Sequence, residues 1–220
     1  MVHSGFSIDF NNLPQTLPIF PLGGVLLLPY GRLPLNVFEP RYLAMTDDAL
    51  ATDRLIGIIH PATYETQENQ NSVFKTGCAG RITAFSETED RRYLITLSGL
   101  VRFNVVEEIP TSRGYRRVVP DWGPYKTDYL DEKNFEFNKE RLLVALKRYF
   151  EKKAIDADWE TINKMDDARL VTTLAMICPF DTPEQQALLM AKNIEERAET
   201  IISLLEISTH ETNEVGDVRH

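Results

Sequence analysis

The sequence changes its hydrophobic period once, at residues 121–124, and this change constrains the fold more than any other feature. Before it, short apolar runs are separated by Pro and Gly, and Val101 and Phe103 lie in a run that alternates apolar and polar residues, as in a half-buried strand. After it, apolar residues recur three and four positions apart, the spacing of one helix face. We therefore expect an α+β chain, with a β-rich lobe over 13–122 and a small helical bundle over 123–207.

The first lobe contains about seven strand signals and one short helix signal. The expected strands cover residues 17–24, 33–38, 54–59, 78–85, 93–97, 100–106 and 115–119, and the expected helix covers 40–51. So many short strands in about 110 residues favour a closed or nearly closed β-barrel. Residues 65–72 predict a loop, and the polar ends, 1–12 and 208–220, predict a flexible lead-in and a flexible tail.

Charge and hydropathy argue against a nucleic-acid or membrane partner. The net charge is −9, and residues 121–220 carry most of it, with 13 Lys and Arg against 21 Asp and Glu. Such a balance repels phosphate backbones, so nucleic acid is an unfavoured partner. The longest apolar run, residues 25–28, is far shorter than the roughly 20 residues that span a bilayer. Residues 1–5 lack the features of a secretory signal, so we expect a cytoplasmic protein.

The residues that carry most enzyme chemistry are scattered. Cys78 and Cys178 are a hundred positions apart, which indicates free buried thiols rather than a disulfide or a nucleophile. The histidines are equally dispersed, at positions 3, 60, 210 and 220. No phosphate-binding G-x-x-x-x-G-K-[ST] motif occurs, and the Gly23-Gly24 stretch lacks its lysine. We expect no catalytic residues, no metal site and no cofactor.

One apolar stretch is a candidate contact surface. Three leucines lead into Pro29-Tyr30-Gly31-Arg32 between two expected strands. If this link lies on the surface, Leu28, Tyr30 and Arg32 form a candidate peptide contact, with Tyr30 as an aromatic anchor. The alternative is that Leu26 and Leu28 continue a buried strand and that Tyr30 caps the barrel. Nearby, Phe38 and Tyr42 are expected to pack in the core between strand and helix.

Several segments together resemble the N-terminal domain family of Lon proteases. In chain order they are Leu17–Gly23, Pro29, Leu33–Leu35, Phe38-Glu39-Pro40-Arg41-Tyr42, Gly77–Ile82, Tyr93–Gly99, Arg102-Phe103, Pro183–Leu189, Arg197 and Leu204. The resemblance covers roughly residues 13–206. It implies a PUA-like β-barrel followed by a helical bundle, a domain that helps full-length Lon proteases to select polypeptides. The sequence departs from full-length Lon proteases because it lacks the phosphate-binding motif and ends shortly after the matching segments, so we expect a stand-alone module without ATPase or Ser/Lys protease domains.

Three functions follow as hypotheses. The first is a non-catalytic module that binds unfolded or apolar polypeptide segments, with a protease or a chaperone as a further partner in protein quality control. The second is RNA binding, which PUA-like barrels can perform and which a contiguous basic face would favour. The third is a small hydrolase, which would require a pocket of convergent polar groups for which the sequence offers no candidate.

Overall fold

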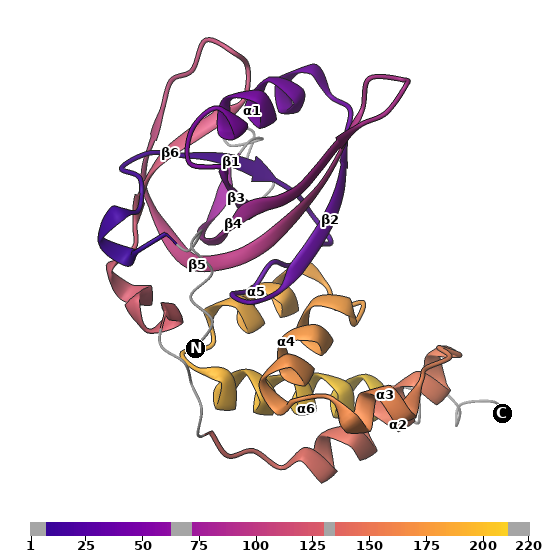
Figure 1. The fold of residues 1–220 in the computed structure, drawn as a ribbon. Coiled ribbons are helices and arrows are strands. Elements are labelled where there is room, and N and C mark those ends of the chain that lie inside the picture. Colours follow the sequence, from indigo (N-terminus) through magenta and orange to yellow (C-terminus); the bar gives the residue numbers. More distant parts are fainter. Residues whose placement is uncertain (1–7, 63–71, 130–134, 211–220) are drawn as a thin grey trace, which may run out of the picture. The chain divides into compact units, whose positions relative to one another are not determined.

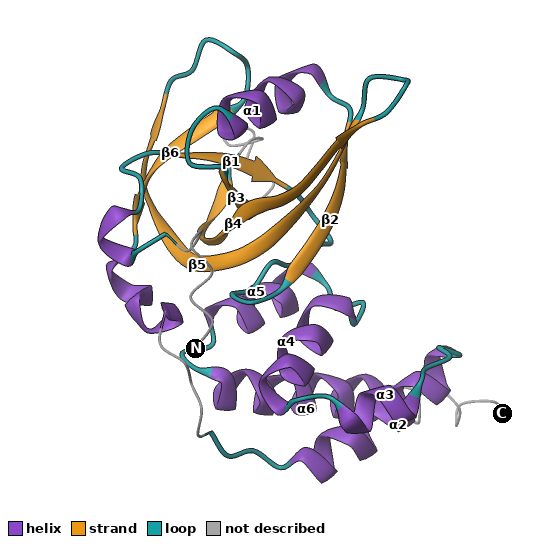
Figure 2. Cartoon of the chain, viewed as in Figure 1, coloured by secondary structure: helices purple, strands orange, loops and turns teal. Residues whose placement is uncertain are grey.

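The computed structural model describes residues 8–62, 72–129 and 135–210, and the chain divides into two compact units, Met1–Asp131 and Glu132–His220 (Figure 1). The first unit contains the strands and the second contains helices (Figure 2). The strands are β1 (Leu17–Pro21), β2 (Arg32–Val37), β3 (Leu55–Pro61), β4 (Val73–Glu87), β5 (Tyr93–Ile109) and β6 (Arg116–Asp121). The same unit contains the short 3₁₀ segments η1 (Phe10–Asn12) and η2 (Gly123–Tyr129) and the helix α1 (Pro40–Leu50).

The strands form one sheet that closes on itself. The strand order is β2-β5-β4-β3-β1-β6, and an additional pairing joins β6 to β5. Strands β5, β4, β3, β1 and β6 therefore make a ring, and β2 lies beside β5 outside that ring. The pairing of β1 with β3 is parallel, and the other pairings are antiparallel. The closure is uneven because β5 shares one of its edges between two partners. The α+β class and the barrel are confirmed.

Strand β5 is longer than the sequence pattern predicts. The expected strands 93–97 and 100–106 form one strand, Tyr93–Ile109, so the described residues contain six strands rather than seven. The intervening Gly99 does not end the strand, because β4 continues to pair across it, with register shifts that mark bulges. One of these shifts leaves Leu100 without a partner on β4, between Gly99 and Val101.

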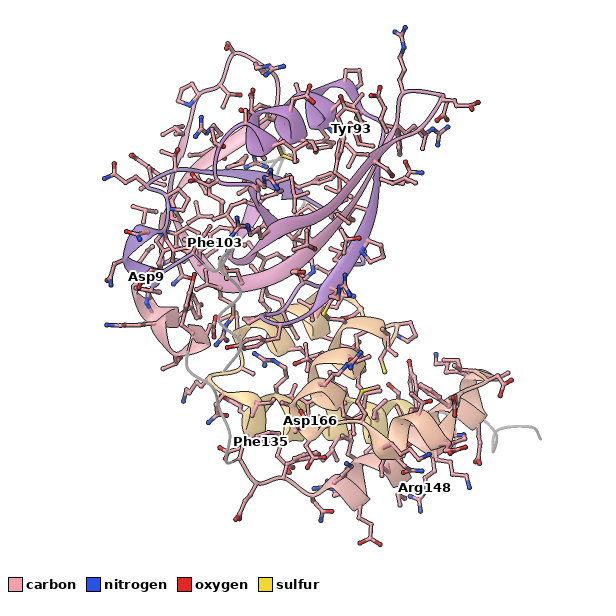
Figure 3. All side chains as sticks on the ribbon, viewed as in Figure 1. Asp9, Tyr93, Phe103, Phe135, Arg148 and Asp166 are labelled. Atoms are coloured by element: carbon pink, nitrogen blue, oxygen red, sulfur yellow. The ribbon has the colours of Figure 1, made fainter. Side chains whose placement is uncertain are left out.

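Phe103 occupies the centre of the barrel core. Its side chain is fully buried (Figure 3). It belongs to a cluster of apolar residues from all five strands of the ring, namely Leu17, Ile19, Leu55, Ile59, Ala79, Val101 and Val118. Gly57 and Gly77 lie against its ring, so a Cβ at either position would come within 3.0 Å of Phe103 carbons. The ring also packs edge-on against Trp122, at 5.8 Å between centroids. A large aromatic thus fills the barrel where its neighbours are glycines.

Helix α1 packs against β1 and β3. Pro40 occupies its first turn, where a missing N–H is tolerated. Tyr42 is buried and lies on the ring of Phe20, at 3.9 Å between centroids, which confirms its predicted core position. Phe38 is different. Its side chain is 61% exposed, so the prediction that it packs in the core is wrong.

The second unit is a bundle of five described helices. They are α2 (Lys139–Lys153), α3 (Trp159–Lys164), α4 (Asp167–Ile177), α5 (Thr182–Met190) and α6 (Ile194–His210), and α6 contacts α2, α4 and α5. Side-chain caps define their starts: Asn138, Asp158, Asp166 and Asp181 each accept a backbone N–H of the following turn. Asp181 and Glu184 form a reciprocal capping box. The N-cap of α5 is therefore Asp181.

The boundaries differ from the expected ones at three places. Residues 123–129 belong to the first unit, whereas the sequence pattern assigns them to the helical lobe. Within the expected lead-in, Phe10 packs against the barrel core as part of η1, and residues 1–7 lie outside the described residues. Helix α6 continues to His210, and the expected loop at 65–72 lies almost entirely outside the described residues. No helix among the described residues is long and apolar enough to cross a membrane.

Candidate functional site

Strand β5 changes partners along one edge, and this change creates a local opening in the sheet. Residues Tyr93–Ser98 pair with β2, and residues Asn104–Ile109 pair with β6. The stretch between them, Gly99–Phe103, has no strand partner on that edge, and we call it the seam. Backbone N–H and C=O groups at a strand edge must be satisfied in some other way. At the seam, the hydrogen-bond partners come from the backbone of the turn at Tyr30 and from the carboxylate of Asp128.

The Tyr30 turn comprises residues Leu28–Gly31. The N–H of Gly31 donates to the carbonyl of Leu28 at 2.9 Å, and Tyr30 has a φ of 65°. With Pro29 before it, this pattern is typical of a type II turn, in which glycine usually occupies the position of Tyr30. A left-handed conformation costs a residue with a Cβ roughly 1–2 kcal/mol. Strain of this kind at an exposed aromatic side chain is consistent with a functional role.

The turn is fixed to the seam by two backbone hydrogen bonds. Tyr30 N–H donates to the carbonyl of Gly99 at 3.0 Å, and Gly99 N–H donates to the carbonyl of Gly31 at 2.8 Å. A Cβ on Gly99 would lie 1.9 Å from the carbonyl oxygen of Leu28, so only glycine allows this approach. Upstream, the buried His60 ring donates from Nε2 to the carbonyl of Val25 at 2.9 Å. The loop that carries Tyr30 is therefore anchored at both ends.

The structure separates the three residues predicted as a peptide contact. Tyr30 is 69% exposed and Arg32 is exposed at the start of β2. Leu28 is 0% exposed, so its side chain cannot contact a ligand in this structure, and its selection as a contact residue is wrong. The whole leucine run 26–28 is buried, and the Leu27 side chain lies against Gly80 and Gly99. The alternative is correct in that Leu26 and Leu28 are buried, but residues 25–28 do not form a strand.

A buried ion pair satisfies the other end of the seam. The backbone N–H of Arg102 donates to Oδ2 of Asp128 at 2.9 Å, and the guanidinium Nε and Nη2 donate to the same carboxylate, with Nη2–Oδ1 at 2.6 Å. The two side chains are only 3% and 6% exposed. Burial acts to lower the pKa of Arg102, but the hydrogen bonds and charge of Asp128 outweigh burial, so this pKa is raised. Asp128 thereby holds η2 against β5.

Aromatic rings surround this pair and the Tyr30 turn. The Arg102 guanidinium lies 4.7 Å from the centroid of the Tyr125 ring, and Tyr30 Oη donates to the main-chain carbonyl of Asp128 at 3.0 Å. Tyr129 packs edge-on against Phe10, at 5.5 Å between centroids. Its hydroxyl is buried and has no hydrogen-bond partner among the described residues. Burial raises the pKa of Tyr129 to about 12, with smaller contributions from nearby acidic groups.

A second exposed aromatic group, at the other end of β2, was not predicted. We call Phe38 together with Arg92 the Phe38 cluster. Phe85 and Tyr93 form a separate aromatic pair, because Tyr93 pairs with Val37 and therefore lies on the face opposite to Phe38. Phe85 is 44% exposed and packs edge-on against Tyr93, at 5.0 Å between centroids. The Arg92 guanidinium lies 5.7 Å from the centroid of the Phe38 ring. The alternation of Leu33, Leu35 and Val37 was the missed signal, because it directs position 38 to the opposite face.

The described residues offer little for metal or nucleophilic chemistry. No group of three or more His, Cys, Asp or Glu side chains among residues 8–62, 72–129 and 135–210 could hold a metal ion. Cys78 and Cys178 are buried thiols, as predicted. Burial raises the pKa of the Cys178 thiol to about 12, which opposes formation of the reactive thiolate.

The chain matches the model of one known protein family. The model of the ATP-dependent protease La (LON) substrate-binding domain matches residues 16–206, which include all six strands and nearly all of the helical unit. The chain belongs to the Lon substrate-binding domain family. The family resemblance inferred from the sequence motifs is therefore confirmed.

Similar proteins fall into the same group. Lon protease 2 of Myxococcus xanthus is 32% identical over 101 residues, which cover 46% of this chain and 12% of that protein. Lon protease of Haemophilus influenzae is 24% identical over 201 residues, which cover 89% of this chain and 24% of that protein. The chain thus spans about a quarter or less of the length of these Lon proteases.

Solved structures show the same fold. A Lon N-terminal domain protein from Xanthomonas campestris aligns with a TM-score of 0.59 at 23% identity and covers 86% of this chain and 97% of its own. The N-terminal domain of Lon protease from the Mycobacterium avium complex aligns with a TM-score of 0.57 at 15% identity. At these identities the similarity supports the fold of the Lon domain, and the contact residues must be argued from this chain.

Proposed function

We propose that this Lon-family module binds exposed apolar segments of polypeptides through the surface around Tyr30. The observation that carries the proposal is the conformation of Tyr30 itself. Its ring is 69% exposed, its backbone is held at a φ of 65°, and its hydroxyl is hydrogen-bonded to Asp128. An aromatic side chain held in this way offers a large contact area at low cost in conformational entropy.

The Phe38 cluster supplies a second contact for the same polypeptide segment. Tyr30 precedes β2 and Phe38 follows it, so the two aromatic residues lie near opposite ends of this six-residue strand. Such a strand is about 20 Å long, the length of roughly six extended residues. Arg32, at the first position of β2, adds a donor for a backbone carbonyl or a carboxylate. We expect a short apolar segment, bound with a micromolar dissociation constant, because a flexible ligand loses entropy on binding.

The surface arginines argue against RNA as the ligand. Arg92, Arg113 and Arg116 each form an ion pair with a carboxylate, respectively with Asp90, Asp48 and Glu108. Their charge is locally neutralised, so they offer little net attraction to phosphates. We therefore retain RNA binding only as an outcome that the binding experiment can reveal.

The role in proteolysis is also a proposal. The family module is a substrate-binding domain, and similar chains occur within Lon proteases. We infer that the module selects polypeptides for a protease or a chaperone in protein quality control, and that its own contribution is binding without catalysis. A cytoplasmic location would suit this role.

The test is a binding titration with matched variants. Fluorescence anisotropy of labelled apolar, aromatic-rich and charged peptides, and of a single-stranded RNA, is measured at 50 and 200 mM salt. We expect apolar peptides to bind with little salt dependence, whereas binding through several phosphate contacts would weaken about a thousandfold. Tyr30→Ala should weaken peptide binding by about tenfold or more, since burying a large side chain contributes about 1.5–3 kcal/mol.

Two further variants locate the surface. Phe38→Ala should also weaken binding, because it removes the exposed aromatic ring of the Phe38 cluster. Val106→Ala is the control, since Val106 is 64% exposed on β5 in the stretch that pairs with β6, away from Tyr30 and Phe38. Peptide binding that is unchanged in Tyr30→Ala would refute the assignment of the site. Tight, salt-sensitive RNA binding without peptide binding would refute the function and leave the fold intact.

A further inference from the structure

Both polar ends of Tyr30 are linked to strand β5, the backbone N–H directly and the hydroxyl through Asp128. Its backbone N–H donates to the carbonyl of Gly99 on β5, and its hydroxyl donates to the carbonyl of Asp128. Asp128 is in turn bound by Arg102, three residues after Gly99 on the same strand. Both anchors of the ring therefore depend on the seam of β5, although Asp128 and Tyr30 are 98 residues apart in sequence.

The second anchor is rigid because the Asp128 carboxylate is fully engaged. It accepts the Arg102 backbone N–H at 2.9 Å, Nε at 3.0 Å and Nη2 at 2.6 Å. Two-pronged, charge-assisted contacts of this type fix orientation as well as distance. The Tyr125 ring packs on the guanidinium, and both charged side chains are shielded from water. With its side chain fixed, Asp128 presents its main-chain carbonyl to Tyr30 in one position.

We propose that Asp128, held by Arg102, is the positioning residue for the Tyr30 contact. This inference rests on the proposed binding of polypeptides at Tyr30. Asp128 is not itself the contact, because its side chain is 6% exposed. It holds the exposed ring in the orientation in which a polypeptide meets it. A ring fixed before binding loses less rotational freedom on binding, an advantage of about two- to tenfold in affinity.

A double-mutant cycle tests this proposal. Dissociation constants for one fluorescein-labelled aromatic-rich peptide are measured with the wild type, Tyr30→Phe, Asp128→Asn and the double variant. Tyr30→Phe keeps the ring and removes only the hydroxyl anchor, and we expect it to weaken binding about two- to tenfold. Asp128→Asn disturbs the same anchor, so the double variant should bind no more weakly than the weaker single variant.

A control from the same part of the chain accompanies the cycle. The Asp121 carboxylate accepts the N–H of Gly123 at 3.0 Å, and the residue is exposed. Asp121→Asn should leave peptide affinity unchanged, because no described contact joins it to Tyr30. Urea unfolding of all variants gives the structural comparison. Loss of stability from Asp128→Asn should be slightly smaller with Phe than with Tyr at position 30, because part of it is the loss of the hydroxyl anchor, and the losses in affinity should likewise be less than additive in free energy.

The outcomes separate the two proposals. Two results would overturn the positioning role of Asp128. One is a wild-type affinity in Tyr30→Phe, and the other is a loss of affinity in the double variant that equals the product of the two single fold-losses. If Asp128→Asn does not fold, the affinity of Tyr30→Phe alone decides, since this exposed change leaves the buried ion pair intact. Wild-type affinity in Tyr30→Ala would instead overturn the binding site at Tyr30. Weak binding by Tyr30→Ala together with wild-type binding by Tyr30→Phe would retain the site and reject the positioning residue.

Discussion

Replacing Gly99 by alanine should detach the Tyr30 turn from the barrel. The added Cβ would lie 1.9 Å from the carbonyl oxygen of Leu28, whereas such contacts are essentially never shorter than 3.0 Å. The turn must therefore move by about 1.1 Å, the difference between these two distances. A shift of this size takes the two hydrogen bonds between Gly99 and the turn, now 3.0 and 2.8 Å, to roughly 4 Å.

The expected change in unfolding free energy follows from those bonds. Each contributes about 0.5–1.5 kcal/mol net, so their loss costs about 1–3 kcal/mol. Alanine restricts the unfolded chain more than glycine does, which returns about 0.4–1 kcal/mol. The net destabilisation is about 1.3 kcal/mol at the centre of a range of about 0–2.6 kcal/mol, and the central value corresponds to a fall in Tm of about 3–5 °C for a chain of this length. Peptide affinity should fall as well, because the ring of Tyr30 is no longer held in place.

Two measurements check this result. Urea unfolding in a Trp159→Phe background reports the first unit through the fluorescence of Trp122, so the helical unit does not obscure the transition. Hydrogen exchange of the Tyr30 and Gly99 amides reports the two bonds directly. Gly23→Ala is the control, because the nearest atom to its added Cβ, on Pro61, is 3.8 Å away. Unchanged stability and unchanged amide exchange in Gly99→Ala would refute the proposed role of the seam.

Two further predictions concern buried titratable groups. The pKa of Tyr129 is raised from an unfolded value near 10 to about 12, so the folded state binds this proton more tightly, and stability that is constant below pH 10 should fall as the pH rises to about 12. Because the residue is partly exposed, the effect should be no more than about 1–2 kcal/mol. Urea titrations against pH should show a smaller fall in Tyr129→Phe, and an identical pH dependence in both proteins would contradict this reasoning. Cys178, with a pKa raised to about 12, and the buried Cys78 should not react with a disulfide reagent at pH 8 until the protein unfolds. Rapid reaction of the folded protein, seen as release of the reagent's coloured thiolate, would show that the cysteines are accessible.

Some features of the candidate site could be predicted from the sequence, and others could not. Tyr30 was identifiable because Pro29 and Gly31 mark a turn between two strand signals. The exposure of Phe38 was also predictable. The residue follows an alternating run, and as an even-numbered position it points away from the face on which the odd-numbered apolar residues are buried. The burial of Leu28 was not identifiable, because an apolar run beside a turn reads equally well as a surface patch or a buried loop.

The sequence by itself determined the fold class, the order of the two units and the family. These depend on local patterns, namely the change in hydrophobic period after Asp121 and the capping residues such as Asp166, and on motifs that act within a few residues. Only the tertiary structure decided how β5 divides its edge between β2 and β6, and which groups fill the seam between them. The pairing of Arg102 with Asp128 is one such feature. The two residues are 26 positions apart, and no local pattern in the sequence predicts that they contact each other. A charged pair becomes necessary there because the closing sheet leaves one stretch of backbone without a strand partner, and that need exists only after the chain has folded.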